Sequence, residues 1–182
     1  LVYTRLNNHY RGLHRICQLF INHTSINNDQ GNIRFRSFLL DMNLLFEAFI
    51  GSYLKERLES LPGIRVLLQK REYLDKEKRI TMKPDIVITN QGKPVLIIDT
   101  KYKHLDEGEI KHADIYQMYT YCSTLNVGKG MLLYGEGEGA QYQANVPAGL
   151  DIETRVFQLG GNYDSFQEEC VQFSWHVMGC IS

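Results

Sequence analysis

The sequence predicts an α/β fold in which a mixed β-sheet is flanked by helices, and three observations predict it. A stripe of apolar residues at helical spacing runs through residues 41–60. Short apolar, β-branched segments follow between 65 and 102, separated by turn residues. A second helical pattern over 112–125 leads into another apolar strand. Successive strands bracketed by helices are typical of a mixed sheet with helices packed on it.

Two helices are expected before the first strand. Residues 1–22 carry apolar side chains at helical spacing, and the Asn-, Ser- and Asp-rich residues 22–33 are typical of a loop. The helix over 41–60 has Asp41 as its expected N-cap and ends at Leu61-Pro62-Gly63.

The central strands are expected over 65–73, 79–89 and 94–102. The polar residues 75–78 would turn between the first two strands. Residues 90–94 (Asn-Gln-Gly-Lys-Pro) would close a hairpin between the second and third.

The remaining elements are a helix over 112–125, a buried strand at 131–134, a Gly-rich loop at 135–139, and late strands at 152–159 and 169–175. No internal repeat or linker divides the sequence, so 182 residues are expected to form one domain.

The composition is that of a soluble globular protein, with 43% hydrophobic and 23% charged residues. No apolar run reaches the roughly 18 residues of a membrane span, and charged residues interrupt residues 1–20, unlike a signal peptide. The four cysteines are scattered, which favours reduced thiols in the cytoplasm and fits no standard zinc spacing.

Charge is distributed unevenly along the chain. Residues 1–133 carry a net charge of +5 and residues 134–182 carry −6. Residues 65–83, just upstream of Asp85 in the predicted hairpin, carry +4. A basic ribbon of this kind suits a phosphate-rich polymer, although a solvated hairpin with interspersed charges gives the same pattern.

Two acids stand where ordinary core strands would hold Val or Ile. Asp85 precedes the strand Ile86–Ile88, and Asp99 follows Val95–Ile98. The hairpin would bring Asp85 roughly opposite Asp99, and the alternation of a strand puts Lys101 on the face of Asp99. Two neighbouring carboxylates repel unless a cation lies between them, so the pattern predicts a divalent metal site.

Magnesium is the metal expected, with manganese as a substitute, because it is bound by one or two carboxylates and keeps several waters. Asp85 and Asp99 would be ligands, and the backbone carbonyl of Thr100 offers another oxygen. Lys101 would position or deprotonate an attacking water, or neutralise developing charge. Burial would lower the pKa of Lys101 and the acids would raise it, and the sequence leaves that balance open.

Four further candidates come from the helices. Glu47, at the edge of the apolar stripe, would reach the metal as a ligand or through a water once its helix packs on the sheet, although such a Glu is commonly a surface residue. Gln117 and Tyr121 share a helix face and, with Tyr116, would line the site, unless they simply belong to an amphipathic helix.

These elements resemble the PD-(D/E)xK nuclease superfamily. The matching residues are Pro84-Asp85 and Asp99-Thr100-Lys101, with Glu47 similar to the acid of the first helix. The segment Gln117–Tyr121 is similar to the Gln-x-x-x-Tyr element of the RecB-like branch. A restriction-endonuclease-like core is the fold that this resemblance implies.

The resemblance narrows to the McrC family, the nuclease subunits of McrBC-type modification-dependent restriction systems. It covers about residues 1–135, and the segments that carry it are Phe38–Glu47, Lys83–Ile86, Ile98–Lys103 and Asp114–Met118.

The resemblance implies a single nuclease domain over 1–182, with a helical lead-in (1–60), a catalytic core (61–135) and C-terminal strands (136–182). It also implies a Mg²⁺-dependent endonuclease in the prokaryotic cytoplasm that cuts methylated double-stranded DNA with a GTP-driven AAA+ partner. Lys83 and Lys103 would contact the DNA, and a dimer of nuclease subunits would cut both strands. Family members carry an additional N-terminal region for the ring, so this chain is expected to be the nuclease domain alone or a shorter relative.

Two alternatives stay open at this point. A RecB-like repair nuclease or exonuclease would use the same residues on DNA ends. A non-catalytic nucleic-acid-binding assembly module would keep the fold without the chemistry.

Overall fold

The computed structural model describes residues 41–105, 112–137, 142–146 and 149–181. The helix and loop predicted within 1–33 lie outside these residues. The chain divides into two units, Leu1–Asp41 and Met42–Ser182, and all elements described below belong to the second.

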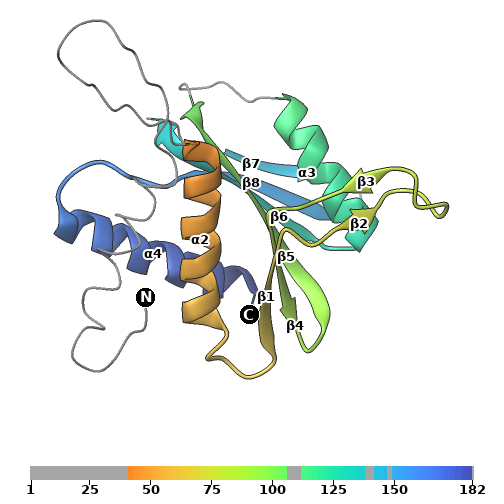
Figure 1. Cartoon of the computed structure of the whole chain (residues 1–182), viewed down its shortest axis with the longest axis horizontal. Helices are drawn as coiled ribbons and strands as arrows, with labels where there is room; N and C mark the ends of the chain where they lie inside the picture. The colour runs from red at the N-terminus through yellow and green to blue at the C-terminus, as the bar shows by residue number, and fades with distance from the viewer. Residues whose placement is uncertain (1–40, 106–111, 138–141, 147–148, 182) are drawn as a thin grey trace, which may run out of the picture. The chain divides into compact units, whose positions relative to one another are not determined.

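Six strands of the described residues form one mixed sheet in the order β1-β4-β5-β6-β8-β7, which confirms the predicted mixed sheet flanked by helices (Figure 1). Pairs β1–β4, β4–β5 and β7–β8 are antiparallel, whereas β5–β6 and β6–β8 are parallel. The bounds are β1 Ile64–Leu68, β4 Ile86–Asn90, β5 Lys93–Leu105, β6 Lys129–Gly137, β7 Tyr142–Val146 and β8 Leu150–Val156.

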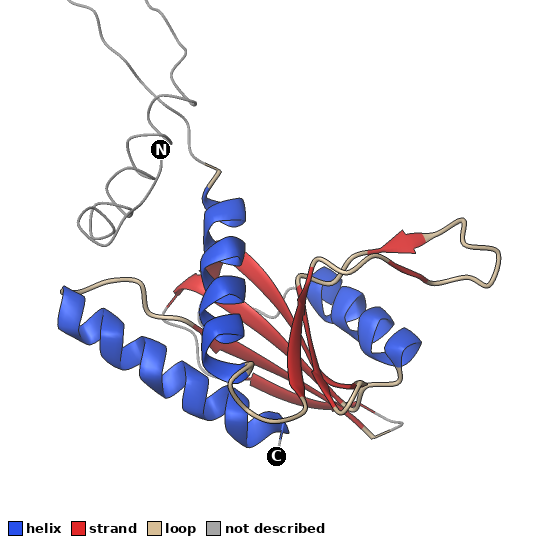
Figure 2. Cartoon of the chain, turned by 60° about the horizontal axis from the view of Figure 1, so that its bottom comes forward, coloured by secondary structure: helices blue, strands red, loops and turns tan. Residues whose placement is uncertain are grey.

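The helices cover both faces of this sheet. Helices α2 (Met42–Leu58) and α4 (Tyr163–Ile181) lie on one face, and α3 (His112–Leu125) lies on the other (Figure 2). Helix α3 connects β5 to the parallel strand β6, as such a crossover requires.

Each face has its own apolar core. Ile50 of α2, Phe157 after β8 and Phe173 of α4 are fully buried in the first, with the rings of Phe157 and Phe173 edge to face at 5.5 Å. Met118 of α3 and Tyr134 of β6 belong to the second. The strands between the two cores therefore carry apolar side chains on both sides over much of their length, and the buried polar exceptions include Asp99 and Thr100.

The segment predicted as one strand over 65–73 is broken in the structure. Gln69 has a left-handed backbone (φ 48°), which ends β1 and turns the chain away from the main sheet. The short strands β2 (Glu72–Tyr73) and β3 (Thr81–Met82) then pair only with each other and form an arm that projects from the sheet (Figure 1).

The hairpin between β4 and β5 forms at the predicted place. Asn90 pairs with Lys93, so Gln91 and Gly92 alone make the turn, with φ of 50° and 80°. Two consecutive positive φ angles are those of a type I′ turn, in which the right-handed twist of the strands is preserved. Pro94 lies at a register shift of this pair, where its missing N–H is tolerated.

Two predictions for the C-terminal part are wrong. The strand predicted at 169–175 is the middle of helix α4, whose buried residues recur every three or four positions: Cys170, Phe173, Ser174, Val177 and Ile181. The loop predicted at 135–139 is in part the end of β6, which runs to Gly137. Segment 136–182 therefore contributes a helix as well as strands.

Candidate functional site

Asp99 and Lys101 lie together on the α3 face of β5, as the strand alternation predicts. Ile97 belongs to the core under α3 and Ile98 to the opposite core, so Asp99 and Lys101, two and four residues after Ile97, face α3. Lys101 Nζ lies 2.5 Å from Asp99 Oδ2. Asp99 is only 2% exposed, and this oxygen is buried and has no partner with hydrogen-bond geometry.

Helix α3 supplies a polar pair to the same place. Lys101 Nζ donates a hydrogen bond to Gln117 Oε1 (3.0 Å), and Gln117 Nε2 donates to the Tyr121 hydroxyl (2.8 Å). The i, i+4 spacing predicted to place Gln117 and Tyr121 on one face does so. Tyr116 is 66% exposed and its ring neighbour is His112, so it is not part of this chain of contacts.

Asp85 reaches the site from the residue before β4. The β4–β5 register pairs Ile86 with Ile98, so Asp85 stands one position before, next to the Asp99–Thr100 peptide. Its Oδ2 accepts hydrogen bonds from the backbone N–H (2.7 Å) and the hydroxyl (2.8 Å) of Thr100. These two donors hold the Asp85 carboxylate beside Thr100.

A cavity of about 410 Å³ opens on the other side of Asp85, toward α2. It is lined by Leu44, Glu47, Ala48, Ser52, Leu68, Gln69 and Asp85. Gln69 Nε2 donates to Glu47, and Lys83 Nζ donates to Gln69 Oε1 at 2.8 Å. The left-handed Gln69 also donates its backbone N–H to the Asp85 carbonyl (2.8 Å), so the turn that ends β1 is tied to the acid.

The pKa values of Asp99 and Glu47 are raised because both acids lie near Asp85 and are partly removed from solvent. Burial and the neighbouring Asp85 raise the pKa of Asp99 to about 6, although Lys101 acts in the opposite direction. Burial and Asp85 likewise raise the pKa of Glu47. Asp85 is thus close enough to influence an acid on each side of it.

Lys101 has a raised pKa, which settles a balance that the sequence leaves open. Burial opposes its charge, but the attraction of Asp99, with Asp114 and Asp85, exceeds this effect. At neutral pH the side chain is therefore an ammonium ion and a hydrogen-bond donor.

Asp114 and Tyr134 are polar neighbours of the site that sequence reasoning missed. Asp114, at the start of α3, is buried and accepts a hydrogen bond from the Tyr134 hydroxyl (2.8 Å). Its second partner is Lys103, whose Nζ lies 2.6 Å from the same carboxylate oxygen. Tyr134 pairs with Lys101 in the β5–β6 register, so this group adjoins the Lys101 ammonium.

The sequence matches the profile of the family described as McrBC 5-methylcytosine restriction system component over residues 1–135. The chain belongs to this family. This match confirms the family resemblance that the four sequence segments indicate. Comparison with curated proteins gives no match.

A solved structure has the same fold as this chain. It is a chain of an assembly of Thermococcus gammatolerans McrB AAA+ hexamers with bound McrC, with 21% sequence identity and a TM-score of 0.63. The match covers 97% of this chain and 40% of the solved chain, so this chain spans less than half of that length. Among the described residues, no helix is long and apolar enough to cross a membrane.

Asp85 and Asp99 are the candidate ligands for a divalent cation at this site. Among the described residues, Glu47, Asp85 and Asp99 do not form a group whose ligand atoms all lie within 4.8 Å of one another. The buried Asp99 Oδ2 lies beside the Lys101 ammonium, and the charge of this carboxylate is opposed by Asp85. A second cation beside Asp99 would offset the repulsion by Asp85.

Proposed function

We propose that this chain is the Mg²⁺-dependent DNA endonuclease component of a 5-methylcytosine-dependent restriction system, with a PD-(D/E)xK active site at the junction of β4, β5 and α3. The observation that carries the proposal is the placement of Asp85 directly before β4 and of Asp99 and Lys101 on the paired strand β5, with Gln117 bonded to Lys101.

Asp85 and Asp99 are the residues that would hold the ion, with the Thr100 carbonyl as a further oxygen ligand. When bound, Mg²⁺ supplies a Lewis acid for the scissile phosphate and a water of lowered pKa. Glu47 faces Asp85 across the cavity and would act through water rather than as a direct ligand.

Lys101 would act as a charged donor to the phosphate, not as a base. Its raised pKa keeps it protonated, and Gln117 holds it from the side of α3. Because an ammonium has three N–H donors, it can keep Gln117 and still donate to a phosphoryl oxygen.

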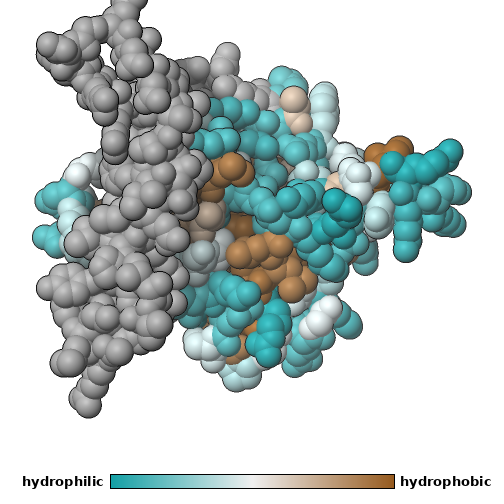
Figure 3. Space-filling model, in the orientation of Figure 1, coloured by the Kyte–Doolittle hydropathy of each residue, from teal (hydrophilic) through white to brown (hydrophobic). Residues whose placement is uncertain are grey.

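The β2–β3 arm supports contact with the DNA backbone. Between residues 70 and 83 the chain has six Lys or Arg and three Asp or Glu, and the surface of the arm is mostly hydrophilic (Figure 3). Several of these cations are exposed, as Arg79 is with 77% of its side chain. Contacts of this type give affinity that falls steeply with salt and carries no sequence information.

Recognition of the methylated base is assigned to a GTP-driven, McrB-like AAA+ partner. The solved assembly that shares this fold contains McrB AAA+ hexamers with bound McrC. Since a double-strand cut requires two active centres, two nuclease subunits would act together.

The test combines the chain with its AAA+ partner, GTP, Mg²⁺ and methylated circular plasmid. Asp85→Asn, Asp99→Asn and Lys101→Ala should each lower cleavage at least a hundredfold, with unchanged far-ultraviolet circular dichroism. Lys55→Ala, which removes an exposed cation of α2, is the matched control and should cut normally.

The same assay separates the alternatives. Cutting of linear but not circular DNA would instead indicate a RecB-like exonuclease. DNA binding without any cleavage, or cleavage that survives all three substitutions, would reject the proposed site.

A further inference from the structure

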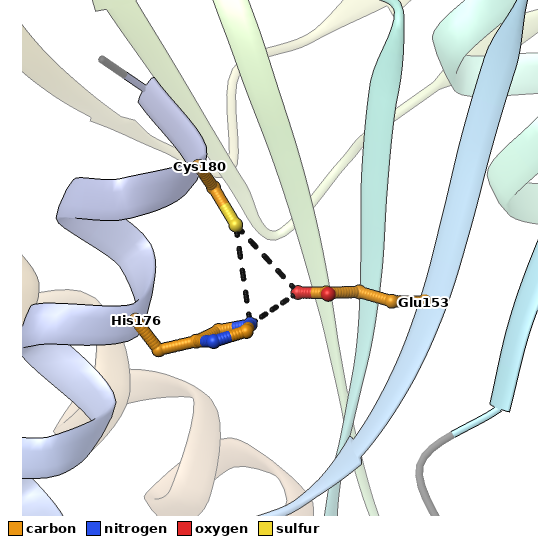
Figure 4. Close-up of side chains that lie close together, drawn as sticks. All are labelled: Glu153, His176 and Cys180. Atoms are coloured by element: carbon orange, nitrogen blue, oxygen red, sulfur yellow. Dashed lines mark hydrogen bonds and ion pairs between the residues drawn. The ribbon is translucent and has the colours of Figure 1, made fainter.

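A second cluster of metal-ligating side chains lies between α4 and β8, and none of its residues belongs to the candidate active site. His176 and Cys180 are one turn apart on α4, and Glu153 points toward them from β8 (Figure 4). His176 Nε2 lies 2.7 Å from Glu153 Oε1, and Cys180 Sγ lies 3.8 Å from the same oxygen and 3.9 Å from Nε2.

This donor set is specific for a class of metal. One thiolate, one imidazole and one carboxylate suit a borderline-soft ion such as Zn²⁺, whereas Mg²⁺ and Ca²⁺ require oxygen ligands. The cluster is also the only group of three His, Cys, Asp or Glu ligand atoms within 4.8 Å of one another among the described residues.

The separations are close to those of a tetrahedral site. With metal–ligand bonds of the usual length, the S–N and S–O edges would each be about 3.6 Å and the N–O edge about 3.3 Å. The sulfur distances of 3.9 and 3.8 Å need to shorten by roughly 0.3 Å, and the 2.7 Å His–Glu contact to lengthen by roughly 0.6 Å. Small rotations of side chains that are only half-buried would achieve this.

Asp151 provides an independent observation on the same face of β8. It stands two residues before Glu153, so its side chain lies on the same side of the strand. Its Oδ2 accepts a hydrogen bond from Gln143 (2.8 Å), but its Oδ1 is buried without any partner. Asp151 is also close enough to Cys180 for its charge to act on the thiol.

Lys129 of β6 is a cation beside the cluster. Its Nζ donates to the Cys180 carbonyl at 3.4 Å and reduces the negative potential there. One ammonium against two carboxylates leaves the environment net negative, which favours a divalent ion.

We propose that Glu153, His176 and Cys180 form a Zn²⁺-class site that fastens helix α4 to the sheet, with Asp151 as a fourth ligand or as the acceptor for a metal-bound water. Binding converts the Cys180 thiol to a thiolate and releases its proton to solvent, with no change of redox state. The site is structural, because it joins the last described helix to β8.

Titration of the full chain with Co²⁺ under reducing conditions tests this proposal. Co²⁺ bound to a thiolate gives a charge-transfer band in the near ultraviolet, which a site made only of oxygen ligands cannot give. We expect one equivalent with this band, and a higher midpoint of thermal unfolding with Zn²⁺ than with Mg²⁺.

Three variants make the result decisive. Cys180→Ser, a nearly isosteric change at a half-buried position, should abolish the band, and His176→Ala should weaken Co²⁺ binding at least tenfold. Cys170→Ala, in the same helix, should leave both unchanged. Absence of the band in the wild type, its persistence in Cys180→Ser, or unchanged affinity in His176→Ala would overturn the proposal.

Co²⁺ at the candidate active site is distinguished in the same experiment. Asp99→Asn should remove any thiolate-free binding and leave the charge-transfer band intact. The zinc-class site and the proposed nuclease site are therefore tested independently of each other.

Discussion

Asp99→Asn should stabilise the fold in the absence of divalent cations, even though it removes a residue of the proposed active site. The pKa of Asp99 is about 6 in the folded chain, against an ordinary value of 3.8 for an aspartate. At about 1.4 kcal/mol for each pKa unit, ionising this carboxyl costs the folded state about 3 kcal/mol. Lys101 already lowers this pKa, so the loss of its ion pair is included in that figure. The expected gain is therefore about 3 kcal/mol above pH 6.

The difference in stability between the wild type and Asp99→Asn should depend on pH. Because burial raises the pKa of Asp99, the folded state binds more protons than the unfolded state between pH 3.8 and about 6, and the wild type loses stability as pH rises through that window. Wild type and Asp99→Asn should therefore be most alike at pH 4 and differ fully above pH 6. Without its carboxyl, the variant lacks this part of the pH dependence.

Urea unfolding at pH 5 and pH 8 with EDTA measures the effect, with Glu168→Gln as a control that removes an exposed acid of α4. Mg²⁺ at ten times its Kd should add about 1.4 kcal/mol to the wild type and nothing to Asp99→Asn. A variant that is less stable than the wild type at pH 8 in EDTA would refute the view that Asp99 is held ionised against its environment.

Three further substitutions test the surroundings of the site. Tyr134→Phe removes the buried donor to Asp114 and should lower the free energy of unfolding by about 1.5–3 kcal/mol, because the acceptor is charged; urea titration measures it. Gly130→Ala should cost about 1–3 kcal/mol in the same assay, because the new methyl would lie 2.7 Å from the Met118 side chain where α3 packs on β6. Gln117→Ala should lower the kcat of plasmid cleavage roughly tenfold and leave the KM for DNA unchanged.

The central hairpin and α3 could be predicted because their signals are local. The apolar runs on either side of Gln91 and Gly92 define both strands, and the turn residues allow the positive φ angles that the type I′ turn needs. The alternation of β5 then places Asp99 and Lys101 together without further information. The α3 boundaries, His112–Leu125, match the predicted 112–125.

Other features could not be read from local patterns. Aromatic and β-branched residues near Phe173 favour a strand when taken alone, and only the recurrence of buried positions along α4 shows the helix. Asp114 and Tyr134 are 20 residues apart and form no motif, so only the β5–α3–β6 crossover brings them together. The position of Glu47 opposite Asp85 likewise depends on how α2 packs over the end of β1.

Asp85 is the charged residue that links the two sides of the site. It raises the pKa of Glu47 on the cavity side and of Asp99 on the α3 side, while Lys101 neutralises Asp99 and is itself held by Gln117. The ion pair lets the chain fold with a buried carboxylate when no metal is bound, since an uncompensated charge there would be far more costly. In the proposed nuclease, sharing the Asp99 charge with Mg²⁺ would free Lys101 to turn its remaining donors to a phosphate. The Asp99–Lys101 pair would thus stabilise the metal-free fold and also hold the Lys101 ammonium where it can donate to a phosphate.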